Sequence, residues 1–258
     1  MSDFDRNAQV WGAGRAQQTS AVELDQGLRS FMLGVYNNMT IGLAITGLFA
    51  IGISMLAIAG YSPTGKVTAL TPLGQALYLS PLKWVVMLAP LAFIFFFSFR
   101  AEQMSSSSAR AMFFAFAAVM GVSLSSIFVV FTSESIARVF FITAATFGGL
   151  SLYGYTTKKS LSGLGSFLIM GLIGLILASV VNIFLASSAL GFAVSVIGVL
   201  IFAGLTAWDT QRLKEMYLYS GLDAESAAKL SVNGALSLYL DFVNMFQLLL
   251  SLFGNRQE

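Results

Sequence analysis

The sequence contains no cysteine and no histidine, and only 10% of its 258 residues are charged. Without cysteine, the chain has no disulfide framework, no thiolate nucleophile and no cysteine-held metal. Without histidine, it lacks the usual side chain that changes charge near neutral pH, which is also the commonest metal ligand. Carboxylates therefore remain as the groups that could titrate or bind a cation in apolar surroundings.

The low charge accompanies long apolar runs. Hydrophobic residues make up 57% of the chain and mean hydropathy is +0.80, whereas a soluble domain carries about 25% charged residues. Runs of about 20 apolar residues are long enough to cross a bilayer as helices. Such runs cover roughly residues 31–59, 82–99, 110–132, 137–157, 163–186, 191–210 and 232–253. They lack the alternation of apolar and polar residues that is typical of strands in a membrane β-barrel. We therefore predict an all-α polytopic membrane protein with seven transmembrane helices.

The connections between these runs are short, which predicts one membrane domain. We place it at residues 31–254, after a polar tail at 1–30 and before a short tail at 255–258. The longest connection, about 60–81, is rich in glycine and proline and is predicted to be a loop with several turns. The first apolar run is long enough to act as a signal anchor, so no cleavable signal peptide is expected.

Basic residues indicate the orientation. With a cytoplasmic N-terminus, ten of the 14 lysines and arginines fall on the cytoplasmic side, as the positive-inside rule requires. If the last segment crosses fully, the C-terminus lies outside. If that segment is re-entrant, the C-terminus returns inside, and the tail is too short for its charge to separate these alternatives.

Two aspartates interrupt the apolar sequence. No charged residue lies between Lys159 and Asp209, and Asp241 lies inside the last apolar run. A carboxylate near the centre of a spanning helix costs roughly 2.5–3.5 kcal/mol on insertion scales, so one without a role is rarely tolerated. A boundary cap or local ion pair would explain Asp209 without a function, and a structural buried acid would explain Asp241. The alternative is a shared site for protons or cations.

The last run has one polar face. Ser237, Asp241, Asn244 and Ser251 are spaced by four, three and seven residues, which places them on one stripe of a helix. Ser237 and Asn244 are therefore candidates to line a pathway. If the sixth run starts near residue 191, Asp209 is about 27 Å along it, near the cytoplasmic boundary, and Asp241 is about 14 Å deep. The two could meet if either helix tilts or unwinds.

Two carboxylates about 4 Å apart would repel by about 4 kcal/mol at an effective dielectric constant of 20. We expect such a pair to hold one proton and to titrate as a unit. With one proton it could act as a latch, and with none it would suit a hard cation such as Ca²⁺. Arg100, at the inner end of the second run, is the expected countercharge. Its positive charge could hold Asp209 ionised and close the cytoplasmic mouth of the site.

The same residues carry a resemblance. Trp208–Gln211 and Leu238–Phe246 resemble the C-terminal signature of the Bax inhibitor-1 family, and Gly121–Phe128 and Thr143–Ser151 resemble further blocks of that family. The resemblance implies a bacterial inner-membrane protein in which six helices enclose the last one. It also implies an aspartate dyad, here Asp209 and Asp241, that controls a pH-sensitive Ca²⁺ leak, with Arg100 as a latch. Residues 212–231 are expected to form a longer loop than in compact bacterial members.

Three function classes can be compared with these sequence features. The first is a passive cation leak gated by the two aspartates, which would bind Ca²⁺ only transiently. The second is a regulator without transport activity that binds other membrane proteins or a membrane protease, with the polar tail as its contact. The third, an intramembrane aspartyl protease, lacks the Gly-x-Gly-Asp motif before Asp241. We therefore expect no enzyme and no cofactor. The expected partners are the lipid bilayer, Ca²⁺ or other cations, and other membrane proteins, but not nucleic acid.

Overall fold

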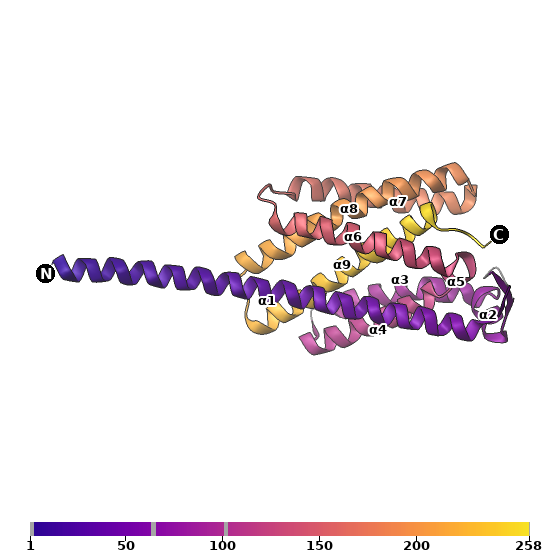
Figure 1. Cartoon of the computed structure of the whole chain (residues 1–258), viewed down its shortest axis with the longest axis horizontal. Coiled ribbons are helices and arrows are strands. Elements are labelled where there is room, and N and C mark those ends of the chain that lie inside the picture. Colours follow the sequence, from indigo (N-terminus) through magenta and orange to yellow (C-terminus); the bar gives the residue numbers. More distant parts are fainter. Residues whose placement is uncertain (1–2, 63–65, 101–102, 258) are drawn as a thin grey trace.

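Almost all of the described chain is helical, because apolar runs that cross a membrane must satisfy their backbone hydrogen bonds within each segment. The computed structural model describes residues 3–62, 66–100 and 103–257, and their side chains except those of 3–23, 97 and 98. Most helices lie lengthwise beside one another, with a small hairpin at one end (Figure 1). The elements are α1 (Asp3–Ala57), β1 (Ile58–Tyr61), β2 (Val67–Leu70), α2 (Pro72–Tyr78), α3 (Leu82–Arg100), α4 (Ser106–Leu124), α5 (Ile127–Val130), α6 (Ser133–Thr156), α7 (Ser162–Leu185), α8 (Ser188–Tyr219) and α9 (Ala224–Phe253).

Six stretches of helix are long and apolar enough to cross a membrane, counted within the described residues. They are Leu24–Ala57 of α1, α4 together with α5, and α6, α7, α8 and α9. The short α2 and the adjoining α3 form a seventh span if the pair is counted as one, with a bend of 62° between them. The bend falls at the connection that contains Pro81, which cannot donate a helical hydrogen bond. The prediction of an all-α polytopic membrane protein is confirmed.

Helix α9 is the central element of the bundle. It packs against α1, α4, α6 and α8, whereas α3 packs mainly on α4 and α7 mainly on α8. Half of the most apolar window of α9 is buried, against a third or less in the other spans. Figure 1 shows α9 running obliquely across the bundle. The last helix is thus central, although four helices supply its main contacts rather than all six.

One polar contact fixes α9 against α1 and α4. The hydroxyl groups of Tyr239 and Thr46 share a hydrogen bond of 2.7 Å, and Thr46 donates to the carbonyl of Ala117 at 2.9 Å. The Tyr239 ring is fully buried and meets Phe113 and Phe116 edge to face, with centroid separations of 5.5 and 5.8 Å. A buried tyrosine needs such a partner for its hydroxyl group, so this contact specifies how the three helices pack.

The connection 60–81 is more ordered than the predicted loop. Strands β1 and β2 form an antiparallel hairpin, and α2 follows it. The Thr71 side chain caps α2 by accepting a hydrogen bond from the Gly74 amide at 3.2 Å. Gly74 packs directly on the Ala57 backbone, where an added Cβ would collide with the carbonyl group. The prediction missed the hairpin because glycine and proline mark turns without indicating which strands pair.

The C-terminal tail is tied to this end of the bundle. The Gln257 amide donates to the Val130 carbonyl at 2.9 Å, and its side-chain oxygen accepts from the Val67 amide at 2.8 Å. The Gln257 side-chain nitrogen donates to the carbonyls of Phe131 and Phe128 at 2.9 and 3.2 Å. The two chain ends lie at opposite ends of the molecule in Figure 1. Helix α9 itself is unbroken from Ala224 to Phe253 and is long and apolar enough to span. That it crosses the membrane fully stays a prediction. Residue 258 of the predicted tail lies outside the described residues.

The predicted long loop at 212–231 is wrong. Helix α8 continues to Tyr219 and α9 begins at Ala224, so that residues 220–223 alone connect them. Gly221 makes the turn with a φ of +54°, a conformation that favours glycine. Leucine, lysine, glutamate and methionine after residue 212 are good helix formers, and they extend α8 beyond the apolar run.

The boundary predicted at residue 30 is also not a break in secondary structure. Helix α1 passes through it without interruption from Asp3, and its first part extends well beyond the other helices (Figure 1). Residues 1–2 and the side chains before residue 24 lie outside the described part. Whether 1–30 forms a separate cytoplasmic segment stays a prediction.

Candidate functional site

Helices α8 and α9 bring Asp209 and Asp241 to the same cavity. This cavity of about 650 Å³ is walled by α7, α8 and α9. Ser237 and Asn244, the two candidates for pathway lining, face it as well. Both helices are unbroken around the aspartates. The aspartates therefore meet without any unwinding of either helix.

The environments of the two carboxyl groups differ. Asp241 is 5% exposed, whereas Asp209 is partly exposed. The groups lie close enough to repel as charges and to share a hydrogen bond. Within the described structure, the Oδ2 atom of Asp241 is buried without a hydrogen-bond partner. An ionised carboxylate only accepts hydrogen bonds. One proton held between the pair would supply the missing donor.

An arginine accompanies the pair, but it is not the predicted one. Arg212 lines the cavity, its charge acts on Asp209, and its guanidinium lies 5.2 Å from the centre of the Trp208 ring. Arg100 is not among the residues that line this cavity, and its guanidinium lies 5.7 Å from the Phe96 ring centre. The latch role of Arg100 stays a prediction. The spacing of Arg212, three residues after Asp209, is the sequence signal for a neighbour on the same helix face.

Other polar residues of α8 position the site, and the sequence reasoning did not single them out. The Gln211 side-chain oxygen accepts from the Leu161 amide at 2.7 Å, and its nitrogen donates to the Lys159 carbonyl at 2.9 Å. On α6, Ser151 bonds to the Thr210 hydroxyl group at 3.0 Å. These contacts hold the part of α8 that directly follows Asp209 against α6 and against the connection before α7. Their partners are distant in sequence, so spacing alone could not reveal them.

The remaining polar residues of the predicted stripe have mostly structural contacts. The Asn244 side chain donates to the Leu240 carbonyl at 2.8 Å, and Ser251 accepts from Ser195 at 3.4 Å, away from the aspartates.

On α7, which forms another wall of the cavity, the side-chain oxygen of Asn182 accepts from the Ser187 amide at 3.1 Å and thereby caps the turn between α7 and α8. The cavity wall from α7 is mainly apolar. Within the cavity, the strongly polar groups are thus the carboxyl pair, Arg212 and a few amide and hydroxyl groups.

The donor set fits a passing cation better than a resident one. Among the described residues, no three aspartate, glutamate, histidine or cysteine side chains gather around a point. Ca²⁺ takes six to eight oxygen ligands in proteins, and two carboxylates supply up to four. Asp209 and Asp241 could therefore bind Ca²⁺ only with water or neighbouring oxygens completing its shell.

Comparisons with known proteins find relatives that cover almost the whole chain. The family model described as inhibitor of apoptosis-promoting Bax1 matches residues 28–258. An uncharacterized protein of Caulobacter vibrioides is 46% identical over an alignment of 272 residues that covers all of both chains. A Rickettsia prowazekii protein is 44% identical over 91% of this chain and 93% of its own. The inner membrane protein YbhL of Escherichia coli K12 is 42% identical over 92% of this chain and 97% of its own. The chain therefore belongs to the Bax inhibitor-1 family of integral membrane proteins.

Proposed function

We propose that this protein is a pH-sensitive leak for Ca²⁺ or similar cations, gated by Asp209 and Asp241. The observation that carries the proposal is the buried Asp241 oxygen, which has no partner among the described residues and lies beside a second carboxyl group. Keeping such a group in a membrane helix is costly. A proton or a cation that occupies the pair would offset that cost.

The gate works through the charge of the pair. With one shared proton, the two carboxyl groups bind each other, and their single negative charge is balanced by Arg212 beside Asp209. When the proton leaves, the two carboxylates repel, and α8 and α9 are no longer held together at this point. The doubly negative pair then attracts a hard cation. Arg212 is the cationic group among the residues that line this cavity, so it competes with the incoming ion.

The proposal extends to location. We place the protein in the bacterial cytoplasmic membrane, as the name of the YbhL relative indicates for that protein. The excess of basic residues supports a cytoplasmic N-terminus. The start of α1 and the connection between α8 and α9 would then lie on the cytoplasmic side.

Ca²⁺ influx into liposomes across a pH series tests the gate. The wild type should show influx that rises with pH, because the shared proton leaves as pH rises. Asp209→Asn and Asp241→Asn should both show influx that no longer varies with pH, since neither retains a pair of titrating groups. Glu134→Gln is the matched control: Glu134 is an exposed acid paired with Arg138 at 2.7 Å, and its loss should leave the pH dependence unchanged.

One observation favours a second candidate, a regulator without transport activity that binds other membrane proteins. The start of α1 extends beyond the rest of the bundle (Figure 1) and offers a surface for a partner. Influx no greater than in protein-free liposomes at every pH would reject the leak and favour this candidate. A phenotype in cells that is lost on deleting residues 3–23, but kept in Asp241→Asn, would then be expected.

A further inference from the structure

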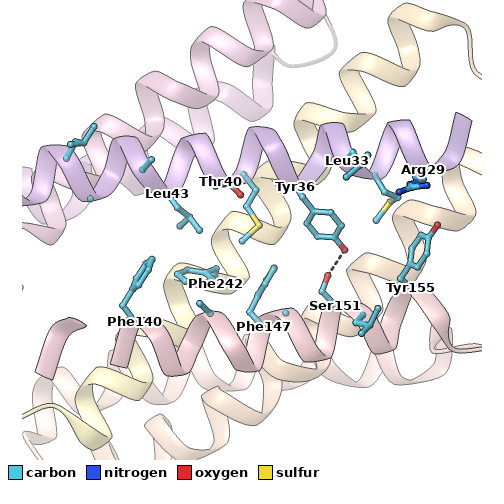
Figure 2. Close-up of a pocket in the computed structure, with 18 of the residues that line it drawn as sticks. Arg29, Leu33, Tyr36, Thr40, Leu43, Phe140, Phe147, Ser151, Tyr155 and Phe242 are labelled. Carbon is cyan, nitrogen blue, oxygen red and sulfur yellow. Dashed lines mark hydrogen bonds between the residues drawn. The ribbon is translucent and has the colours of Figure 1, made fainter. Parts of the chain in front are cut away.

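A second cavity, separate from the aspartates, is larger than the one they line. It has a volume of about 1140 Å³ and lies between α1 and α6, with Phe242 of α9 at its floor. Figure 2 shows its walls, in which side chains of α1 face those of α6. Pockets for small molecules usually measure about 300–1,000 Å³. This groove therefore has room for a larger ligand.

Its polarity changes along its length. Figure 2 places Arg29 and Tyr155 at one end, and Leu43 and Phe140 towards the other. The Lys214 ammonium group donates to the Tyr155 carbonyl at 2.8 Å and lies 5.3 Å from the ring centre. Two basic side chains thus lie near one end, and the rest of the lining is mainly apolar. The groove suits a ligand with an anionic head and a long apolar body.

The Arg29 side chain is available to such a head group. It is exposed, and the ion pair among the described residues is a different one, between Arg138 and Glu134. Asp25 lies one turn earlier on α1, but it is not among the residues that line the groove. The positive charge at this end therefore remains open to an external anion.

The length of the groove matches a membrane. Along α1 it runs from Arg29 to Ile51, a rise of about 33 Å, close to the roughly 30 Å thickness of the hydrocarbon core. Its rims carry exposed apolar side chains, such as Leu33 at 60%, Leu48 at 71% and Leu152 at 63%. In a spanning bundle these side chains face lipid. The groove therefore opens sideways into the bilayer, with Arg29 near head-group level.

The geometry points to a binding site for an anionic phospholipid of the surrounding bilayer. Its phosphate binds Arg29 beside Tyr155, and one acyl chain lies along the groove past Tyr36 towards Leu43. The hydroxyl groups of Tyr36 and Ser151 share a hydrogen bond of 2.5 Å across the groove (Figure 2). Because these hydroxyl groups satisfy each other, this bridge presents no unpaired polar group to an acyl chain that passes over it on the lipid-facing side of the groove.

Two adjacent glycines allow the site to be blocked selectively. Gly148 lines the groove, whereas Gly149 is not among its lining residues. A Cβ added at either position meets no atom within 4 Å. Gly148→Leu should therefore fill the groove without disturbing the fold, and Gly149→Leu should add the same side chain elsewhere on α6.

Photolabelling in nanodiscs tests the site. The full chain is placed in phosphatidylcholine nanodiscs with a trace of phosphatidylglycerol that carries a diazirine on one acyl chain, and labelled peptides are mapped by mass spectrometry. Parallel arms use the same probe on phosphatidylcholine and on a free fatty acid. We expect the phosphatidylglycerol probe to label Leu33, Leu43 or Phe147 more strongly than it labels other apolar surfaces of the protein. Gly148→Leu should reduce labelling of the groove to the level of the other surfaces, whereas Gly149→Leu should leave the stronger labelling of the groove unchanged.

Head-group selectivity tests the role of Arg29. A basic residue near the membrane surface is worth about fivefold in affinity for an anionic lipid. Arg29→Gln should reduce the preference for phosphatidylglycerol over phosphatidylcholine by about that factor. Arg110→Gln, which removes an exposed charge from α4 outside the groove, should not.

The proposed lipid site would be contradicted if the groove is labelled no more strongly than other exposed helices, or if both phospholipids label it equally. It would also be contradicted if Gly148→Leu leaves the stronger labelling of the groove intact, or if the fatty acid is the only probe that labels it. Thermal unfolding of each variant shows whether a lost signal comes from lost structure. If Gly148→Leu unfolds, Gly47→Leu repeats the test from the opposite wall, where an added Cβ also meets no atom within 4 Å.

Discussion

Replacing Asp241 by asparagine should stabilise the protein. The Asp241 Oδ2 atom is buried and unpartnered among the described residues, and a second carboxyl group lies beside it. A buried polar atom without a partner costs about 1–3 kcal/mol. Asparagine has nearly the same shape but carries an amide that can donate to Asp209. At a pH where the shared proton has left and both carboxylates are charged, we therefore expect a gain of about 2 kcal/mol in the free energy of unfolding. While the proton is still shared, the gain should be smaller.

For a chain of this size, 1 kcal/mol shifts the melting temperature by roughly 2–4 °C, so the gain corresponds to about 4–8 °C. Thermal unfolding in detergent, followed by intrinsic fluorescence, measures this shift. Glu134→Gln is the control, because an exposed ion pair contributes only about 0–1 kcal/mol. A melting temperature for Asp241→Asn that falls by several degrees would refute the reasoning, since it would mean that the carboxylate is a satisfied structural group.

Three further predictions concern packing, the tail and topology. Gly154→Leu should lower the melting temperature by several degrees, because its Cβ would collide with the α8 backbone and overpacking costs about 1–3 kcal/mol or more; Gly148→Leu, at an open position, should not. Gln257→Ala removes three side-chain hydrogen bonds, each worth about 1 kcal/mol, and should speed hydrogen exchange of the Val67 amide, which loses its acceptor; unchanged exchange at Val67 would mean that the tail is not held there. In this cysteine-free chain, Lys66→Cys should react with an impermeant maleimide in intact cells, and Ser107→Cys only after permeabilisation; the reverse pattern would invert the topology.

The sequence predicted the membrane architecture because the bilayer imposes a strong physical constraint. Spanning helices need about 20 apolar residues with internal backbone hydrogen bonds, and this chain shows them without ambiguity. The ends of the helices were harder to predict. The apolar pattern ends near Asp209, whereas the good helix formers after residue 212 carry α8 further than its apolar run.

The site was partly predictable for a similar reason. A carboxylate is so costly in a membrane helix that Asp209 and Asp241 stood out, and helical spacing placed Ser237 and Asn244 on the cavity face. The neighbours of the pair depend on how distant helices cross. The sequence therefore favoured Arg100, whereas the structure places Arg212 beside Asp209. The groove between α1 and α6 left no sequence signal, because its lining resembles any apolar helix face.

Infrared difference spectroscopy of the purified protein would test the shared proton most directly. Spectra taken across a pH series should contain a carboxylic acid band that disappears as pH rises, over the same interval in which Ca²⁺ influx increases. Asp209→Asn and Asp241→Asn should each shift or abolish that band, whereas Glu134→Gln should keep it. A band that is absent throughout the pH range in which influx changes, or one that both aspartate variants retain, would contradict a gate built on this pair.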